Sequence, residues 1–441
     1  MSLPDAVPMF RRVFDAPSTG PEASQERAGQ GGGRVYDDSA DEQGWTLSMG
    51  NSVLRIWCAV SVLCMASFTM VTSEFAPIGL LSQISTDLNQ TPSTVGLTVT
   101  LYAWIGAASG LLSNGLNRWI PRRTLLIALM LILAVSNGLA ALSPEFSTLL
   151  GARAVGALAH GVFWAIVAAT AAHIVPSQRM GLATSIVLGG ITIATVMGVP
   201  LINLVGQYDG WRTAFVCLAL MCVVSAGAIA LVLPSMQIHS LAKGGGFAAV
   251  LRRKDLLITY VITGLTAAAH FGAYTFVEPF IGQVPGITPY LIATLLFAFG
   301  AAGFLGNLLS AFFIDRYLMV FILVALVAMA LALVTLGVYG PLLGIAPVVM
   351  LLVVWGVAIS ALFTGLQTWV LRIAGDHTVP ATAVHTAVLN SAIGLGVIIG
   401  GETLNVAGFK GAMLSASVVI VPAIVLMIAA GARARKEPVF S

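Results

Sequence analysis

The stretch that decides the fold is STLLGARAVGALAHGVFWAIVAAT, residues 147–170. It is long and apolar enough to cross a bilayer as a helix, because about 20 apolar residues span the hydrocarbon. It nevertheless contains Arg153 and His160, and helical spacing places both on one face with Trp164. A charge at the centre of a membrane helix costs roughly 2.5–3.5 kcal/mol on insertion scales. We therefore expect this face to line a substrate pathway; the alternative is that Arg153 caps a neighbouring helix and His160 only packs.

The composition excludes a soluble protein. Of the 441 residues, 58% are hydrophobic and 9% are charged, whereas soluble domains carry about 25% charged residues. We expect no nucleic-acid partner, because no basic tract with interleaved aromatic residues occurs. The four cysteines lie in apolar segments without metal-ligand spacing, and no Walker motif occurs. The sequence therefore predicts an integral membrane protein that is not an enzyme and holds no metal or cofactor.

Apolar segments recur along the chain after a polar, glycine-rich start. Residues 1–50 are predicted to be a disordered cytoplasmic tail, with Met49 as an alternative start. Twelve membrane helices are expected near 53–76, 95–117, 123–142, 147–170, 181–206, 212–233, 256–280, 289–313, 318–339, 345–368, 382–404 and 410–431. The longest polar connection, 234–255, divides them into two six-helix bundles, 51–233 and 256–431, followed by a tail at 432–441. The predicted fold is an all-α membrane protein.

The positive-inside rule sets the orientation. With a cytoplasmic N-terminus, most lysines and arginines of the loops lie inside, and only Arg212 and Lys410 lie outside. Both termini are therefore predicted to be cytoplasmic.

The two halves resemble each other. The first predicted helix ends in TSEFAPIG, with Glu74 before Pro77, and the seventh ends in TFVEPFIG, with Glu278 before Pro279. Similar groups at matching places are typical of transporters built from repeats, whose substrate sites lie near the midplane between the halves. Both glutamates could instead fix helix ends by bonding the main chain.

The motifs resemble those of the major facilitator superfamily, in its drug/proton antiporter group, and within it the bacterial sugar efflux transporters. The resemblance covers residues 53–431 and rests on Thr72-Ser73-Glu74-Phe75, Leu101-Tyr102-Ala103-Trp104, Ala159-His160-Gly161-Val162-Phe163-Trp164, Gly198-Val199-Pro200-Leu201, Gly210-Trp211-Arg212 and Ala273-Tyr274-Thr275-Phe276-Val277-Glu278-Pro279-Phe280. Two positions depart from it: Arg118 stands where an Asp is usual, and Ile202 stands where a further glycine is usual. The resemblance implies a monomeric multi-pass transporter of the bacterial inner membrane.

Candidate substrate ligands come from both halves. His270, Tyr274 and Glu278 share one face of the seventh helix, and His160 and His270 enter their helices at similar depths. Histidines can donate and accept bonds to sugar hydroxyls, and aromatic rings can stack on a pyranose. The predicted substrate ligands are Tyr102, Trp104, His160, Trp164, His270, Tyr274 and Asn390. Each histidine could also be structural, and the small residues beside Tyr102 (Gly106, Ser109, Ser113) are favoured as helix-packing contacts.

The predicted function is export of a small polar solute, a sugar or a sugar-like glycoside, by proton antiport with alternating access. Glu74, Arg153 and Glu278 are the predicted coupling residues, with ionised Glu74 pairing with Arg153 and protonation releasing the pair. The expected partners are a small-molecule substrate, protons and the lipid bilayer. Two alternatives stay open, namely efflux of an amphiphilic drug such as chloramphenicol or of a nucleoside, and a membrane sensor without transport.

Overall fold

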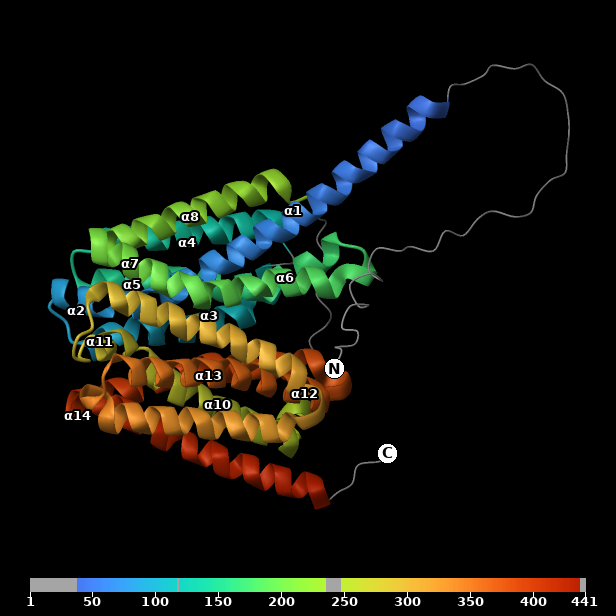
Figure 1. The fold of residues 1–441 in the computed structure, drawn as a ribbon. Coiled ribbons are helices and arrows are strands. Elements are labelled where there is room, and N and C mark those ends of the chain that lie inside the picture. The colour runs from blue at the N-terminus through green and yellow to red at the C-terminus, as the bar shows by residue number, and fades with distance from the viewer. Residues whose placement is uncertain (1–37, 117–118, 235–246, 437–441) are drawn as a thin grey trace, which may run out of the picture. The chain divides into compact units, whose positions relative to one another are not determined.

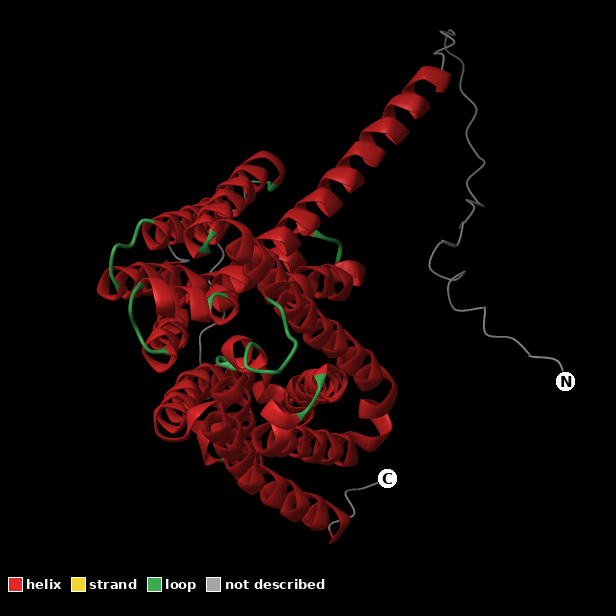
Figure 2. Cartoon of the chain, turned by 60° about the vertical axis from the view of Figure 1, so that its left-hand side comes forward, coloured by secondary structure: helices red, strands yellow, loops and turns green. Residues whose placement is uncertain are grey.

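The computed structural model describes residues 38–116, 119–234 and 247–436. Every regular element within these ranges is a helix, and no strand occurs there, as Figure 2 shows. The prediction of an all-α protein is confirmed. The contacts described below all lie within one compact unit that begins at Ser52. Arg118 lies outside the described residues, as do most of the predicted tail and most of the linker.

The first half of the chain contains the helices α1 to α8 (Figure 1). Helix α1 begins at Asp38, before the predicted boundary at residue 51, and contains Pro77. Gly210 separates α7 from α8. Its φ of +86° interrupts the helix, and glycine adopts such a positive φ without steric cost. The bounds are α1 Asp38–Gly79, α2 Leu81–Asp87, α3 Pro92–Leu116, α4 Arg122–Ala141, α5 Phe146–Ile174, η2 Ser177–Arg179, α6 Met180–Ile193, the π-helical turn η3 Ala194–Gly198, α7 Val199–Asp209 and α8 Trp211–Val232.

The second half contains the helices α9 to α14. Their bounds are α9 Phe247–Arg252, α10 Lys254–Tyr274, α11 Val277–Ile281, α12 Pro289–Tyr339, η4 Gly340–Leu342, α13 Ile345–Ala374, η5 Gly375–His377 and α14 Thr378–Lys436. Non-helical torsions interrupt the two longest helices, α12 at Tyr317 and α14 at Ala407 and Gly408. These breaks coincide with the predicted connections between segments eight and nine and between segments eleven and twelve.

Eight helical stretches among the described residues are long and apolar enough to cross a membrane. One of them is the 51-residue α12, which at ~1.5 Å per residue is more than twice as long as the ~30 Å hydrocarbon core. The break at Tyr317 divides α12 into two pieces of spanning length. The count of twelve crossings, the cytoplasmic termini and the division into two bundles at 234–255 stay predictions.

Glycines allow close helix packing in both halves. A Cβ on Gly161 of α5 would lie 2.0 Å from the Gly106 carbonyl of α3, and a Cβ on Gly400 of α14 would lie 2.0 Å from the Gly272 carbonyl of α10. Only glycine permits such an approach of two helix backbones. Ser109 bonds the main chain at Gly106 and at Ala157, at 3.1 and 3.3 Å. Gly106 and Ser109 are therefore packing residues, as favoured for this stripe.

Hydrogen bonds join the two halves near α2 and α11, which lie side by side at one end of the helices (Figure 1). Ser93 of α3 donates to Asn405 of α14 at 2.6 Å, and Thr100 of α3 donates to the Gly394 carbonyl at 3.2 Å. Glu278 of α11 accepts two bonds from Ser82 of α2. We call this the α2/α11 end.

Candidate substrate and proton site

Helix α5 brings Arg153 to the main chain of α1. The Arg153 guanidinium donates to the Ser73 carbonyl at 2.9 Å and to the Glu74 carbonyl at 2.8 Å. It also lies 4.2 Å from the ring centroid of Tyr102, a cation–π distance. Arg153 is fully buried, and no carboxylate lies within ion-pair distance of it among the described residues. The expected ion pair between the Glu74 carboxylate and Arg153 is thus absent: the two residues meet through the main chain of Glu74.

The Glu74 carboxylate faces His160 instead. The distance from Oε1 of Glu74 to Nε2 of His160 is 3.8 Å, and both side chains are buried. The His160 ring has its centroid 5.2 Å from that of Tyr102 and 6.1 Å from that of Trp164. We call these five side chains, Glu74, Tyr102, Arg153, His160 and Trp164, the Glu74 cluster. All five were predicted site residues, and helices α1, α3 and α5 supply them.

His270 lies in a second, largely aromatic cluster. Its ring stacks on Tyr274 with centroids 5.0 Å apart. Phe299 of α12 and Trp355 of α13 lie 6.2 and 5.6 Å away, and Phe363 lies 5.9 Å away. Nδ1 of His270 and Nε1 of Trp355 are buried without a hydrogen-bond partner among the described atoms. We call this the His270 cluster.

Sequence reasoning missed Trp355, the largest fully buried side chain of the described residues. The available signal was a tryptophan in the middle of the predicted tenth helix, away from the membrane interface where tryptophans are enriched. Its contact with His270 depends on how α10 and α13 pack, which residue spacing within one helix does not reveal.

The Glu278 side chain bonds α2 rather than the His270 cluster. Its Oε2 accepts from the Ser82 N–H at 3.0 Å and from the Ser82 hydroxyl at 2.8 Å. This is the bond to main chain that was left open as an alternative, and it crosses from one half of the chain to the other. Glu278 is buried. Because a buried carboxylate is costly without hydrogen bonds, the two bonds from Ser82 replace those that water would make.

Trp104 and Asn390 belong to neither cluster, but Trp104 contacts the part of α14 that carries Asn390. The Trp104 indole donates to the Ser391 carbonyl at 3.1 Å, and it packs so closely on Gly394 that a Cβ there would lie 2.2 Å from Nε1. Asn390, half-buried, donates to the Thr386 carbonyl at 3.0 Å. The predicted ligands are therefore distributed over three places, of which the Glu74 cluster unites the most.

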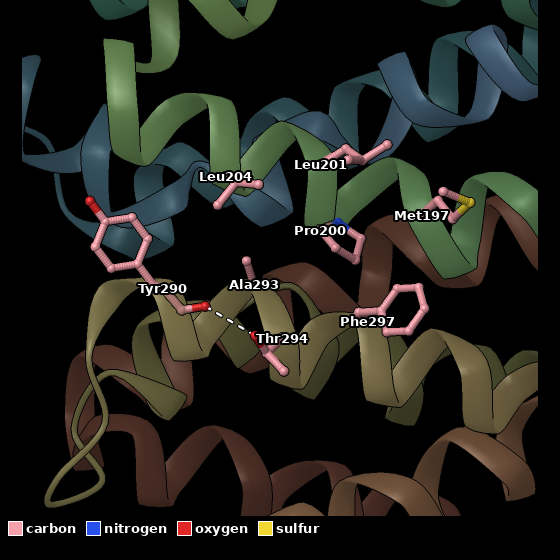
Figure 3. Close-up of a pocket in the computed structure, with 8 residues that line it drawn as sticks. All are labelled: Met197, Pro200, Leu201, Leu204, Tyr290, Ala293, Thr294 and Phe297. Carbon is pink, nitrogen blue, oxygen red and sulfur yellow. Dashed lines mark hydrogen bonds between the residues drawn. The ribbon is translucent and has the colours of Figure 1, made fainter.

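An apolar groove lies elsewhere, between η3–α7 and α12 (Figure 3). It has a volume of about 270 Å³ and is lined by Met197, Pro200, Leu201, Leu204, Tyr290, Ala293, Thr294 and Phe297. The Thr294 hydroxyl bonds the Tyr290 carbonyl at 3.3 Å, so its polarity is already satisfied. None of the predicted site residues lines this groove.

Comparison with known proteins identifies the family of this chain. The sequence pattern of the Major Facilitator Superfamily matches residues 63–400. The chain belongs to this superfamily. It is therefore a multi-pass membrane transporter and not an enzyme, and the alternative of a sensor without transport is not supported.

Two proteins illustrate the similarity within the Major Facilitator Superfamily. A probable sugar efflux transporter of Mannheimia succiniciproducens is 34% identical over 368 residues, which cover 82% of this chain and 92% of the relative. A crystal structure of the nucleoside transporter NupG superposes with a TM-score of 0.71 at 13% identity, covering 85% of this chain and 99% of that one. The first confirms the resemblance to sugar efflux transporters, and the second shows the fold alone.

Proposed function

We propose that this transporter exports a small polar solute, a sugar or a sugar-like glycoside, from the cytoplasm in exchange for protons. The observation that carries the proposal is the 34% identity, over most of both chains, to a protein named a probable sugar efflux transporter. The two six-helix halves would rock about a central site, with the α2/α11 end facing outward and both termini cytoplasmic. The relative is bacterial, which supports a place in a bacterial inner membrane.

Both clusters supply groups suited to a sugar. His160 and His270 each keep a buried Nδ1 without a partner among the described atoms, and a sugar hydroxyl can donate to or accept from such a nitrogen. Aromatic rings flank both histidines, as Trp164 and Tyr274 do. We propose that Tyr102, His160 and Trp164 bind the substrate from one half and that His270 and Tyr274 bind it from the other. Trp104 and Asn390 are proposed to close the site toward the α2/α11 end.

We propose Glu74 as the residue that carries the coupled proton. Its buried carboxylate lies 3.8 Å from His160, a proposed substrate ligand. An ionised Glu74 can only accept hydrogen bonds and does so strongly, whereas a protonated Glu74 accepts more weakly and can also donate its O–H to a histidine nitrogen, so protonation changes how His160 is held for the substrate. Competition between proton and substrate of this kind couples the two fluxes.

A second candidate is efflux of an amphiphilic aromatic compound such as chloramphenicol. The specific observation in its favour is the composition of the His270 cluster, in which Phe299, Trp355 and Phe363 surround one histidine. The ring of Phe271, the next residue along α10, adds a fourth contact at 4.7 Å. Such a lining favours an aromatic solute more than a polyhydroxylated one.

Uptake into inverted membrane vesicles decides between the candidates. Radiolabelled arabinose, a galactoside and chloramphenicol are each supplied with and without an imposed proton gradient. We expect gradient-driven accumulation of a sugar and none of chloramphenicol. Accumulation of chloramphenicol alone would replace the proposal with the second candidate, and sugar uptake that ignores the gradient would make the protein a uniporter.

Histidine variants test the proposed site in the same vesicles. His160→Ala and His270→Ala are each expected to reduce sugar uptake about 5- to 150-fold, because a buried partner lost from a hydrogen bond costs roughly 1–3 kcal/mol. His385→Ala is the matched control, because His385 is equally buried but lies beside Tyr260, away from both clusters. Equal effects in all three variants would contradict the site.

A further inference from the structure

Pro77 leaves one carbonyl of α1 without its helical donor. In a helix, the N–H of residue 77 would bond the carbonyl of residue 73, and proline has no N–H. Helix α1 nevertheless continues through Pro77 to Gly79. The Ser73 carbonyl therefore lacks its helical donor although it lies before the last four residues of the helix, where free carbonyls are usual.

Arg153 of the neighbouring helix α5 donates a hydrogen bond to this carbonyl. One of its terminal nitrogens donates to the Ser73 carbonyl at 2.9 Å, and the other donates to the next carbonyl, that of Glu74, at 2.8 Å. Its Nε has no partner among the described atoms. Two parallel bonds from a rigid guanidinium fix both position and direction, which a single ammonium cannot do.

A second helix, α4, also holds Ser73. The Ser73 hydroxyl donates to Asn137 of α4 at 2.9 Å, and Asn137 contacts Cys222 of α8 through a bond of 3.6 Å. Ser73 is thus held from both α5 and α4, and the Glu74 main chain is held from α5. Glu74 directly follows Ser73, so these bonds fix the main chain from which its carboxylate faces His160.

We propose that Arg153 is a positioning residue: it supplies the hydrogen bond that Pro77 removes from α1 and so holds the Glu74 carboxylate against His160. This inference rests on the proposed role of Glu74 in proton coupling. It differs from a simple charge effect, because the guanidinium contacts carbonyls and the Tyr102 ring rather than the carboxylate. The titratable groups that face Glu74 are Arg153 and His160 from α5 and Tyr102 from α3.

A second-site substitution separates position from charge. Arg153→Lys keeps the positive charge but loses the paired donors. Pro77→Ala restores an N–H to residue 77 and gives the Ser73 carbonyl its own helical partner. If Arg153 stands in for this bond, Pro77→Ala rescues Arg153→Lys, although the charge is the same in the single and the double variant. Pro422→Ala is the matched control, because Pro422 also lies inside a helix, α14, far along the chain.

Two readouts apply to the purified full-length protein in detergent. The first is the thermal unfolding midpoint, Tm, of Arg153→Lys, Pro77→Ala, their double variant and Arg153→Lys/Pro422→Ala. The second is the pH profile of Tm, with the profile of a Glu74→Gln version of each variant subtracted, which isolates the contribution of Glu74. Neither readout needs a transported substrate, so neither depends on whether the exported solute is a sugar.

We expect Arg153→Lys to lower Tm by several degrees and to shift the Glu74-dependent part of the pH profile. Pro77→Ala should reverse both changes and Pro422→Ala neither. In vesicles, arabinose export by Arg153→Lys should fall about fivefold or more and recover to within about twofold of the parent in the double variant. If Pro77→Ala does not restore the Tm of Arg153→Lys, the claim that Arg153 supplies the hydrogen bond missing at Pro77 is wrong. If Tm recovers but the Glu74-dependent part of its pH profile does not, the claim that Arg153 positions the Glu74 carboxylate is wrong. Absence of arabinose export from the parent protein would count against the proposed function alone.

Discussion

Arg153 is a buried charge without an ion-pair partner, and its environment explains how the fold tolerates it. Burying an unpaired charge is costly unless hydrogen bonds compensate. Here two carbonyl oxygens and the Tyr102 ring face the guanidinium. The Glu74 carboxylate consequently forms no ion pair with Arg153 and lies beside His160. At the scale of single residues, the titratable carboxylate of Glu74 and the guanidinium that bonds the main chain of α1 are therefore two groups without an ion pair between them.

The first prediction concerns Glu74 itself. Glutamine keeps the size and the hydrogen-bonding groups of glutamate but cannot titrate. Glu74→Gln should therefore retain substrate exchange between loaded vesicles and lose gradient-driven accumulation. Glu278→Gln, measured in parallel, should keep both activities, because an amide oxygen can still accept from Ser82. Gradient-driven accumulation that survives in both variants would move the coupling proton to a histidine.

Helix α2 shows how a short element is fixed at both ends. Ser82 at its start donates to Glu278, and Asp87 at its end accepts from Trp211 at 3.1 Å and from the Arg212 guanidinium of α8. The hydrogen bond from Arg212 lowers the pKa of Asp87 below its ordinary value. A seven-residue helix has little stability of its own, so these contacts keep it in place.

The second prediction follows from the lowered pKa of Asp87. A carboxyl whose pKa is lower in the folded state stabilises that state above its unfolded pKa, and the contribution disappears as the pH falls through the folded value. Asp87→Asn should therefore lower Tm slightly at pH 7, since an exposed pair contributes at most about 1 kcal/mol. The difference from the parent should begin to shrink near pH 4, the ordinary aspartate pKa, and should disappear only below the lower pKa that Asp87 has in the folded protein.

The control for this measurement is Asp209→Asn, because Asp209 forms no ion pair among the described residues. A gap between Asp87→Asn and the parent that persists unchanged at pH 3 would show that the loss is not electrostatic.

At the scale of the whole transporter, Glu278 joins the two halves at the α2/α11 end. Removing its side chain leaves the Ser82 N–H and hydroxyl without their partner. Because each such loss costs about 1–3 kcal/mol, the equilibrium between conformations open and closed at this end should shift about fivefold or more toward opening.

The third prediction measures that shift with spin labels at Thr86 and Gln283, which are both exposed near this end. Glu278→Ala should increase the population of long distances between the labels. Glu402→Ala is the control, because Glu402 is an exposed carboxylate of α14 near Asn405. A distance distribution that Glu278→Ala leaves unaltered would mean that other contacts hold the halves together.

The fourth prediction tests the orientation of the whole chain. In a variant lacking Cys58, Cys64, Cys217 and Cys222, a single cysteine at Gln178 should react with an impermeant reagent only in inverted vesicles. A single cysteine at Gln283 should react only in right-side-out vesicles. Both positions are exposed. Labelling of both cysteines from the same side would contradict the predicted arrangement of twelve helices with a cytoplasmic N-terminus.

Much of the fold was predictable from the sequence because it depends on local properties. Long apolar segments with few charges require helices in a bilayer, where every main-chain group must find its partner within the segment or in a neighbouring helix. The motif around His160 also carried the resemblance that the superfamily match confirmed. Spacing along α5 correctly placed Arg153, His160 and Trp164 together.

Only the tertiary structure decided what those residues touch. Ser73 and Arg153 are 80 positions apart, and Ser82 and Glu278 are 196 positions apart. Helical periodicity shows which residues share a face, but it does not determine which helix packs against that face, at what height or in what rotation. For that reason the sequence predicted an ion pair between Glu74 and Arg153, and it missed Trp355 beside His270. The fold placed the guanidinium on two main-chain carbonyls of α1, one of which, that of Ser73, has no helical donor because residue 77 is a proline.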